Sequence, residues 1–299
     1  MSVSTHMVAM RDGIRLATDV HLPDGAGPFP VIMERTPYGR TETSRSEITA
    51  ANRTPASRAA IAAGFTSHGY AVVYQDTRGR YGSEGEDHVY GDDAEDGYDT
   101  LEWIANQPWT NQMVGMSGSS AGATTTFAAA SQRHPSLRAF FIQVGASSIY
   151  DDVVCEGQSI EMERLWLWVS KNIPGLSPSH REAVMQRSGL TAAQLDAAAV
   201  TAGKRYARLE AARQAPLPFI ESADWMRLPL TGYPDFATWQ PYLDEIITGA
   251  FGDSDAFRSR CRWRSNTRAK VPLYLAQRSA NISLPLHSYH QAPERLSRT

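Results

Sequence analysis

The first part of the chain carries an alternation of apolar and polar residues that predicts β-strands. His6–Met10 and Ile14–His21 flank the turn signal Arg11-Asp12-Gly13, so this stretch is expected to form a β-hairpin. The Gly- and Pro-rich segment Pro23–Pro30 follows and leads into a short apolar strand at Phe29–Met33. The chain is therefore expected to open with strands rather than helices.

Apolar runs then alternate with segments of helical periodicity. Tyr70–Tyr74 is an unbroken apolar run of the kind found in parallel strands that are buried on both faces. Asp92–Gln107 predicts a helix, because acidic residues crowd its first turn, apolar residues recur on one face and Pro108 ends it. Further elements are expected as helices at Ala59–His68 and Ala121–Gln132 and as strands at Val114–Ser117 and Phe140–Val144. This alternation predicts an α/β fold with a parallel sheet and right-handed crossovers.

The pattern changes from Tyr150 onward, where strand signals are few and helical segments dominate. Thr191 and Gln194 have capping-box spacing before a long Ala-rich helix, and Val271–Leu275 predicts a strand that returns to the sheet. A helical insertion between sheet strands accounts for this order. We therefore expect a first part of the core at residues 1–147, a helical cap insertion at residues 148–265, and a remaining core strand with an atypical tail at residues 266–299.

Composition and charge exclude several classes of protein. The chain has 29 Lys plus Arg against 32 Asp plus Glu, a formal net charge of −3, so nucleic acid and anionic membranes are not expected partners. The Arg-rich stretch between Arg258 and Arg268, around Trp263, is expected to be a solvated or salt-bridged surface. Cys155 and Cys261 predict no disulfide scaffold, and no Cys or His cluster has metal-ligand spacing. Without a signal pattern or a membrane-length apolar run, a soluble cytoplasmic protein is expected.

Gly118-Ser119-Ser120-Ala121-Gly122 matches the pattern G-x-S-x-G, which places a serine on a sharp strand-to-helix turn. The residues two positions before and after such a serine crowd each other unless both are glycine, and only Ser120 meets this condition. The turn also directs the backbone N–H of Ala121 at the oxyanion that develops during acyl transfer. An ordinary Gly/Ser turn before a helix is the alternative. The position between an apolar strand and an Ala-rich helix favours Ser120 as a nucleophile.

Further segments before the serine form a set in a fixed order. Arg35-Thr36-Pro37-Tyr38-Gly39 has the form R-x-P-Y, and Gln75–Gly85 has the form Q-D-x-R-G-x-x-x-S-x-G. The similarity continues through Asp96–Trp103, Gln107–Trp109 and Val114–Met116 into the turn at Gly118–Gly122, which is called the elbow below. Together these segments resemble the cocaine esterase and X-prolyl dipeptidyl aminopeptidase group (CocE/NonD, S15-like) of α/β-hydrolases. The resemblance implies an α/β-hydrolase fold, a mostly parallel sheet flanked by helices, with a helical cap insertion. The group's carboxy-terminal jelly-roll domain is expected to be absent, because no segment of this sequence matches it.

The resemblance also implies roles for individual residues. Ser120 matches the nucleophile that forms the acyl-enzyme, and Tyr38 matches the tyrosine whose hydroxyl forms the oxyanion hole with the backbone N–H of Ala121. The loop Asp76–Gly85 matches a structural loop that ties the strand ends to the floor of the active site. The group usually has an aromatic residue directly after the serine, so Ala121 implies a pocket of different shape. Trp166 and Trp168 either line the acyl pocket or pack within the cap.

The remaining members of a catalytic triad are not matched. The group has its acid in a G-W-x-D segment after the strand that corresponds to Val271–Leu275, whereas Ala276–Asn281 contains neither Gly-Trp nor Asp. One interpretation recruits His287 or His290 as the base, with an acid from elsewhere. The other is that residues 276–299 are foreign to the fold, as a frameshift or a truncated gene would produce.

The leading hypothesis is a serine hydrolase without metal or organic cofactor. It acts on small acyl esters, amides or short X-Pro-type peptides through a Ser120 acyl-enzyme. Two alternatives stay open: an acyltransferase that uses the same elbow, and an inactive, truncated remnant of a hydrolase. The oligomeric state is not predicted.

Overall fold

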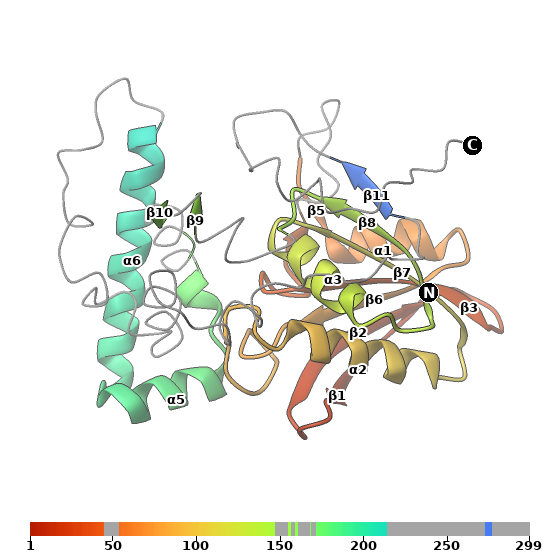
Figure 1. Cartoon of the computed structure of the whole chain (residues 1–299), viewed down its shortest axis with the longest axis horizontal. Helices are drawn as coiled ribbons and strands as arrows, with labels where there is room; N and C mark the ends of the chain where they lie inside the picture. Colours follow the sequence, from red (N-terminus) through yellow and green to blue (C-terminus); the bar gives the residue numbers. More distant parts are fainter. Residues whose placement is uncertain are drawn as a thin grey trace.

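The computed structural model describes residues 1–44, 54–146, 155–156, 159–160, 168, 172–213 and 273–276. In this part of the chain a 7-stranded sheet has the order β1-β2-β6-β3-β7-β8-β11 (Figure 1). Its strands are β1 (Ser2–Ala9), β2 (Arg15–Leu22), β3 (Phe29–Thr36), β6 (Ala71–Asp76), β7 (Thr110–Ser119), β8 (Leu137–Gln143) and β11 (Leu273–Ala276).

The predicted hairpin is confirmed, and it makes one end of the sheet antiparallel. β1 pairs with β2, and the Met10 N–H donates to the Ile14 carbonyl over 2.8 Å across the turn. Gly13 has a φ of 86°, in the left-handed region where glycine carries no Cβ penalty. β2 is also antiparallel to β6, whereas the remaining neighbours from β6 to β11 are parallel. The sheet is therefore mixed, with a parallel majority.

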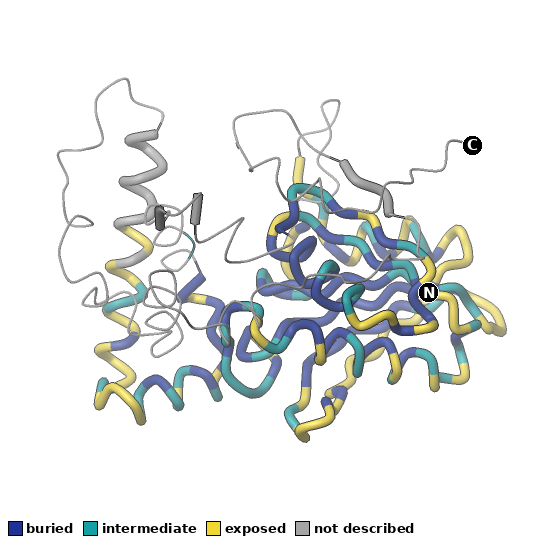
Figure 2. Tube along the Cα trace, in the orientation of Figure 1, coloured by how far each residue is buried: buried dark blue, intermediate teal, exposed yellow. Residues whose placement is uncertain are grey.

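Helices cover both faces of the sheet. α2 (Asp93–Ala105) and α3 (Ala121–Ser131) pack on one face, where Leu101 and Ala129 join Val73 in a single apolar cluster. α1 (Arg58–Thr66) packs on the other face, where Ala62 meets Val72 of β6. Neighbouring residues of a strand point to opposite faces, so β6 is buried from both sides, as its unbroken apolar run predicts. Figure 2 shows the central strands as the most buried part of the chain.

The returning strand is confirmed, and the described part of the segment predicted as the cap, residues 148–265, contains both helices and short strands. β11 pairs in parallel with β8, with Leu273 opposite Phe140. The cap contains η2 (Ile173–Gly175), α5 (Pro178–Ser188) and α6 (Ala192–Arg213) together with a short antiparallel pair, β9 (Cys155–Glu156) and β10 (Ser159–Ile160), which the sequence pattern did not indicate. Another two-residue pair, β4 (Thr43–Ser44) and β5 (Ala56–Ser57), lies before α1.

The capping box before α6 forms as predicted. The Thr191 N–H donates to Gln194 Oε1 over 2.8 Å, and the Gln194 N–H donates to Thr191 Oγ1 over 3.3 Å. Each side chain thus satisfies a backbone donor that the first turn of a helix leaves without an intrahelical partner.

The loop after β6 joins the sheet to the cap. The Tyr81 N–H donates to the Gly175 carbonyl, and the Ser177 N–H donates to the Gly79 carbonyl, both over 2.9 Å. Farther along, the Asp87 N–H donates to Nδ1 of the buried His180 over 2.8 Å. These bonds run from one loop to η2 and to the first turn of α5. The loop therefore has the expected structural role, and it is hydrogen-bonded to η2 and α5 of the cap.

The acidic first turn of α2 is held by the buried Arg35 and the half-buried Arg78. Arg35 of β3 is fully buried, and its Nη1 lies 2.8 Å from Asp93 Oδ1. Its Nη2 lies 3.6 Å from Asp96 Oδ2, and Arg78 Nη2 lies 2.6 Å from Asp96 Oδ1. The acids at this helix N-terminus therefore do more than interact with the helix dipole, because they tie α2 to β3 and to the loop after β6.

Substitution of Asp93 is expected to change how stability depends on pH. Burial raises the pKa of its carboxyl group from 3.8 to about 7, with Arg35 acting in the opposite sense. The folded state thus binds this proton more tightly, so the contribution to stability is complete below about pH 4 and is lost as the pH rises through about 7. Asp93→Asn is expected to remove a slope on the order of 1 kcal/mol per pH unit over this interval in urea unfolding curves. Glu95→Gln, an exposed change in the same turn, is the control; an unaltered slope in Asp93→Asn would contradict the assignment.

Candidate active site

Ser120 occupies a strained turn between β7 and α3. Its φ is 55° and its ψ is −120°, a conformation that residues with a Cβ rarely adopt and that persists only where surrounding contacts enforce it. The Ser120 N–H donates to the Gln143 carbonyl of β8 over 2.9 Å, and the Ser120 carbonyl accepts from the Ala123 N–H over 3.0 Å. The side chain is exposed. The turn therefore presents the Ser120 hydroxyl at the carboxyl end of β7, at the start of a helix.

Close backbone contact requires glycine at position 118 and leaves little room for a side chain at position 122. A Cβ at Gly118 would lie 2.3 Å from both the carbonyl carbon and the carbonyl oxygen of Gly122, closer than real Cβ atoms approach. A Cβ at Gly122 would lie 3.3 Å from the Arg35 carbonyl oxygen, at the end of β3. The G-x-S-x-G spacing thus has the steric reason that the sequence analysis gave, and it packs the elbow against the strand that leads to Tyr38.

Tyr38 lies beside the serine, although 82 residues separate them in the sequence. Its hydroxyl oxygen is 3.4 Å from Ser120 Oγ, and its ring is half-buried. β3 and β7 are parallel neighbours, so their carboxyl ends lie together at one edge of the sheet. Ala121 is the first residue of α3, where backbone N–H groups have no intrahelical acceptor. Tyr38, Ser120 and Ala121, the residues predicted for the site, are therefore brought together.

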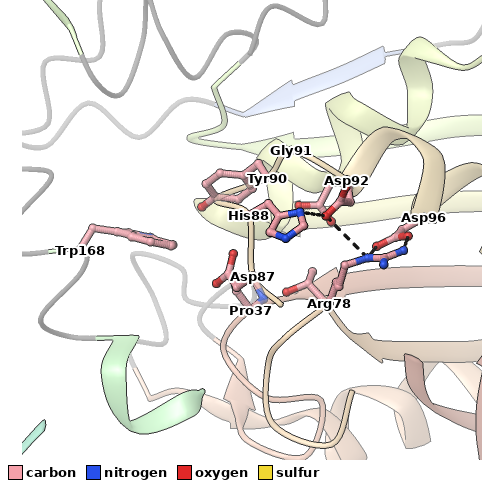
Figure 3. A pocket seen from close by; sticks show the side chains of 11 residues that line it. Pro37, Arg78, Asp87, His88, Tyr90, Gly91, Asp92, Asp96 and Trp168 are labelled. Carbon is pink, nitrogen blue, oxygen red and sulfur yellow. Dashed lines mark hydrogen bonds and ion pairs between the residues drawn. The ribbon is translucent and has the colours of Figure 1, made fainter. Parts of the chain in front are cut away.

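A pocket lies next to the turn that carries Tyr38, and it is rich in carboxylates (Figure 3). His88 Nδ1 lies 2.6 Å from Asp92 Oδ2, and the Trp168 ring lies on the opposite side, with its centroid 5.9 Å from that of Tyr90. Trp168 thus lines a pocket, whereas Trp166 lies outside the described residues. The lining consists of Pro37, Thr77, Arg78, Asp87, His88, Tyr90, Gly91, Asp92, Asp93, Asp96 and Trp168.

The base and the acid of a triad are not found in the described part of the chain. There, Ser120 Oγ has the Tyr38 hydroxyl as a hydrogen-bond partner and no histidine bonds to it. His180 accepts from the Asp87 N–H, and His134 pairs with Glu102 Oε2 over 3.0 Å, so both are bound elsewhere. The candidates His287 and His290 lie outside the described residues.

The same described ranges contain neither a metal-binding cluster nor a membrane-spanning helix. No group of three or more His, Cys, Asp or Glu side chains is arranged there to hold a metal ion. No helix among the described residues is long and apolar enough to cross a membrane.

Comparison with known sequences places these features in a family. The model of the X-Pro dipeptidyl-peptidase (S15 family) matches residues 12–232. The cocaine esterase of Rhodococcus sp. is 36% identical over 181 residues, which are 60% of this chain and 30% of that protein. A putative serine esterase of Mycobacterium bovis is 30% identical over 173 residues, 52% of this chain and 27% of that protein. The chain thus spans about a third of the length of these curated relatives.

Solved structures show the same fold. A CocE/NonD family hydrolase from Staphylococcus aureus is 27% identical with a TM-score of 0.50, over 57% of this chain and 32% of that one. An α-amino acid ester hydrolase is 24% identical with a TM-score of 0.59, over 97% of this chain and 45% of that one. The mixed sheet with helices on both faces is the α/β-hydrolase fold. With the S15 match extending from the hairpin through the elbow into the cap, this chain belongs to the S15 family of X-Pro dipeptidyl-peptidases.

Proposed function

We propose that this protein is a serine hydrolase that cleaves small acyl esters or X-Pro-type peptides through an acyl-enzyme on Ser120. The observation that carries the proposal is the position of the strained Ser120, whose Oγ lies 3.4 Å from the Tyr38 hydroxyl. Family membership supports the same reaction class, since the matching relatives are named esterases, hydrolases and X-Pro dipeptidyl-peptidases.

In this mechanism Ser120 Oγ attacks the acyl carbonyl carbon, and a base takes the proton of the hydroxyl. The carbonyl oxygen becomes an oxyanion that accepts hydrogen bonds from the Tyr38 hydroxyl and the Ala121 backbone N–H. The carbon–oxygen or carbon–nitrogen bond breaks, and the leaving alcohol or amine takes a proton from the protonated base. Water then attacks the acyl-enzyme, releases the acid and restores Ser120. His287 and His290 are the candidates for the base.

Hydrolysis is favoured over acyl transfer to another alcohol or amine. Both reactions begin with the same acyl-enzyme and differ only in the nucleophile that attacks it. The names of the relatives indicate water as that nucleophile. Small esters, amides and short peptides are accordingly the proposed substrates.

The test is covalent labelling of the purified protein with a fluorophosphonate, followed by peptide mass spectrometry. We expect a stoichiometric adduct on Ser120, because a fluorophosphonate reacts with a serine that has a base to activate it. Ser120→Ala should not be labelled, whereas Ser119→Ala, which changes the neighbouring residue of the same turn, should be. A folded wild-type protein that takes up no label would overturn the proposal and favour an inactive remnant.

A further inference from the structure

The turn that carries Tyr38 is held by buried arginines on both sides. Arg80 Nε donates to the Pro37 carbonyl over 3.1 Å, and Arg58 Nη1 donates to the Gly39 carbonyl over 2.8 Å. Both guanidinium groups are buried, with Arg80 only 1% exposed and Arg58 3% exposed. The carbonyl groups directly before and after Tyr38 therefore each accept a hydrogen bond from a cation in a dry environment, where such bonds are strong.

The two arginines differ in how their charge is matched. Arg58 Nη2 is hydrogen-bonded to Glu34 Oε1 over 2.8 Å. Arg80 Nη1 forms a longer ion pair with Asp87 Oδ2, at 3.9 Å, and its guanidinium lies 5.7 Å from the centre of the Tyr81 ring. Position 80 is also one of the open positions of the Q-D-x-R-G-x-x-x-S-x-G pattern. Arg80 is thus a feature of this chain that the motif itself does not account for.

The bond from Arg80 to the Pro37 carbonyl fixes the backbone from which the Tyr38 side chain projects. The Tyr38 hydroxyl in turn lies 3.4 Å from Ser120 Oγ, where an oxyanion would form. A donor that is already held in position stabilises a developing oxyanion without reorganisation.

We propose that Arg80 is a positioning residue for the oxyanion hole: it holds the Tyr38 turn through the Pro37 carbonyl and so keeps the Tyr38 hydroxyl where it can donate to the oxyanion. This inference rests on the proposed function. Arg80 acts through Tyr38 and does not touch the reacting atoms.

Arg80 also lies at the junction with the cap, so a purely structural role is the competing explanation. A Cβ at Gly175 would lie 2.5 Å from Arg80 Nη2, and the backbone of Arg80 forms an isolated bridge with Leu176. If Arg80 served only to seat the cap, its loss would lower stability or substrate affinity whether or not Tyr38 carried a hydroxyl. The experiment must therefore measure coupling between Arg80 and the Tyr38 hydroxyl.

The test is a double-mutant cycle of Arg80→Gln and Tyr38→Phe, with Arg80→Lys added in both backgrounds. Three quantities are measured: kcat and KM for a p-nitrophenyl ester, and the second-order rate of Ser120 labelling by a fluorophosphonate. Removal of one oxyanion donor costs roughly a hundredfold to a thousandfold in kcat, so loss of a group that supports one donor should cost about tenfold. We expect that loss in kcat and in labelling rate for Arg80→Gln, with KM changed less than about threefold, and partial recovery in Arg80→Lys because the charge is retained.

In the Tyr38→Phe background the effect of Arg80→Gln should shrink to less than about threefold, because residues that act through one interaction are not additive. Arg187→Gln breaks the ion pair with Glu86 at the same junction and should leave kcat unchanged in both backgrounds. Thermal melting confirms that each variant is folded. An equal loss on Arg80→Gln in both backgrounds, or a change confined to KM, overturns the inference. Absence of Ser120 labelling in the wild type overturns the proposed function and this inference with it.

Discussion

Replacing Ser120 by alanine is expected to lower kcat for ester hydrolysis by roughly a millionfold, the loss measured when the nucleophile of a serine protease is removed. In the proposed mechanism the Ser120 hydroxyl supplies the atom that forms the acyl-enzyme, and Ser120 is exposed in the strained turn. The Tyr38 hydroxyl and the Ala121 N–H stay in place in this variant, so a residual rate above that in water is expected from oxyanion stabilisation alone.

Ser117 and Ser119 are the matched controls, because both precede Ser120 in the same strand and are half-buried. Their replacement by alanine should change kcat less than about tenfold, since neither has glycine at both flanking positions. Turnover of a p-nitrophenyl ester, followed by the absorbance of the leaving group, measures all three variants. Retention of more than about a hundredth of kcat in Ser120→Ala would show that the hydrolysis does not pass through this serine.

Arg35→Met is expected to lower the free energy of unfolding by about 3–5 kcal/mol, because it leaves buried carboxylates without their cation. Arg35 Nε donates to Gln75 Oε1 over 2.7 Å, and Nη1 pairs with Asp93 at 2.8 Å. The Arg35 side chain therefore joins β3, β6 and α2, and its removal breaks the contact that anchors the first turn of α2 to the sheet. Urea unfolding at about pH 8 measures the loss.

The loss in Arg35→Met should be smaller at about pH 5, because Asp93, whose pKa is about 7, is then protonated and no longer requires a cation. Arg11→Met is the matched control: Arg11 pairs with Asp99 of the same helix at 2.8 Å, but 47% of its side chain is exposed. A pair so exposed contributes about 0–1 kcal/mol. Equal losses in the two variants, or the same loss for Arg35→Met at both pH values, would contradict a buried, charge-compensated network.

The local elements could be predicted because each is encoded within a short window. Gly13 predicts the hairpin because its turn needs a left-handed backbone conformation. The unbroken apolar run predicts β6 as a strand buried on both faces, and the recurring apolar face predicts α2 as a helix. The elbow could be predicted for the same reason, because the residues that would clash, 118 and 122, are only four positions apart in the sequence. β9 and β10 were missed because two-residue strands are too short to show a period.

Contacts between segments far apart in the sequence could not be predicted, because they depend on the order of the strands in the sheet. Arg35 and Asp93 are 58 residues apart, and neither the R-x-P-Y segment nor the acidic start of α2 indicates the other as its partner. The bond between Asp87 and His180 joins residues 93 positions apart, so the sequence of the loop after β6 does not show that the loop is bonded to α5. Arg35 and Arg80 are fully buried, and an arginine is almost never fully buried unless it is paired. The pairing could have been expected if the burial were known, but the sequence alone does not show which arginines are buried.

By itself, then, the sequence determined the longer strands and helices of the core, which serine has the spacing of a nucleophile and which family the motifs resemble. Only the tertiary structure decided that the Tyr38 hydroxyl lies 3.4 Å from Ser120 Oγ, that Arg80 and Arg58 hold the turn between them, and that Asp93 of α2 pairs with the buried Arg35. The physical reason is that periodicity and turn chemistry act over a few residues. Proximity at the edge of a sheet, by contrast, is set by which strands become neighbours, and that depends on the packing of the whole core.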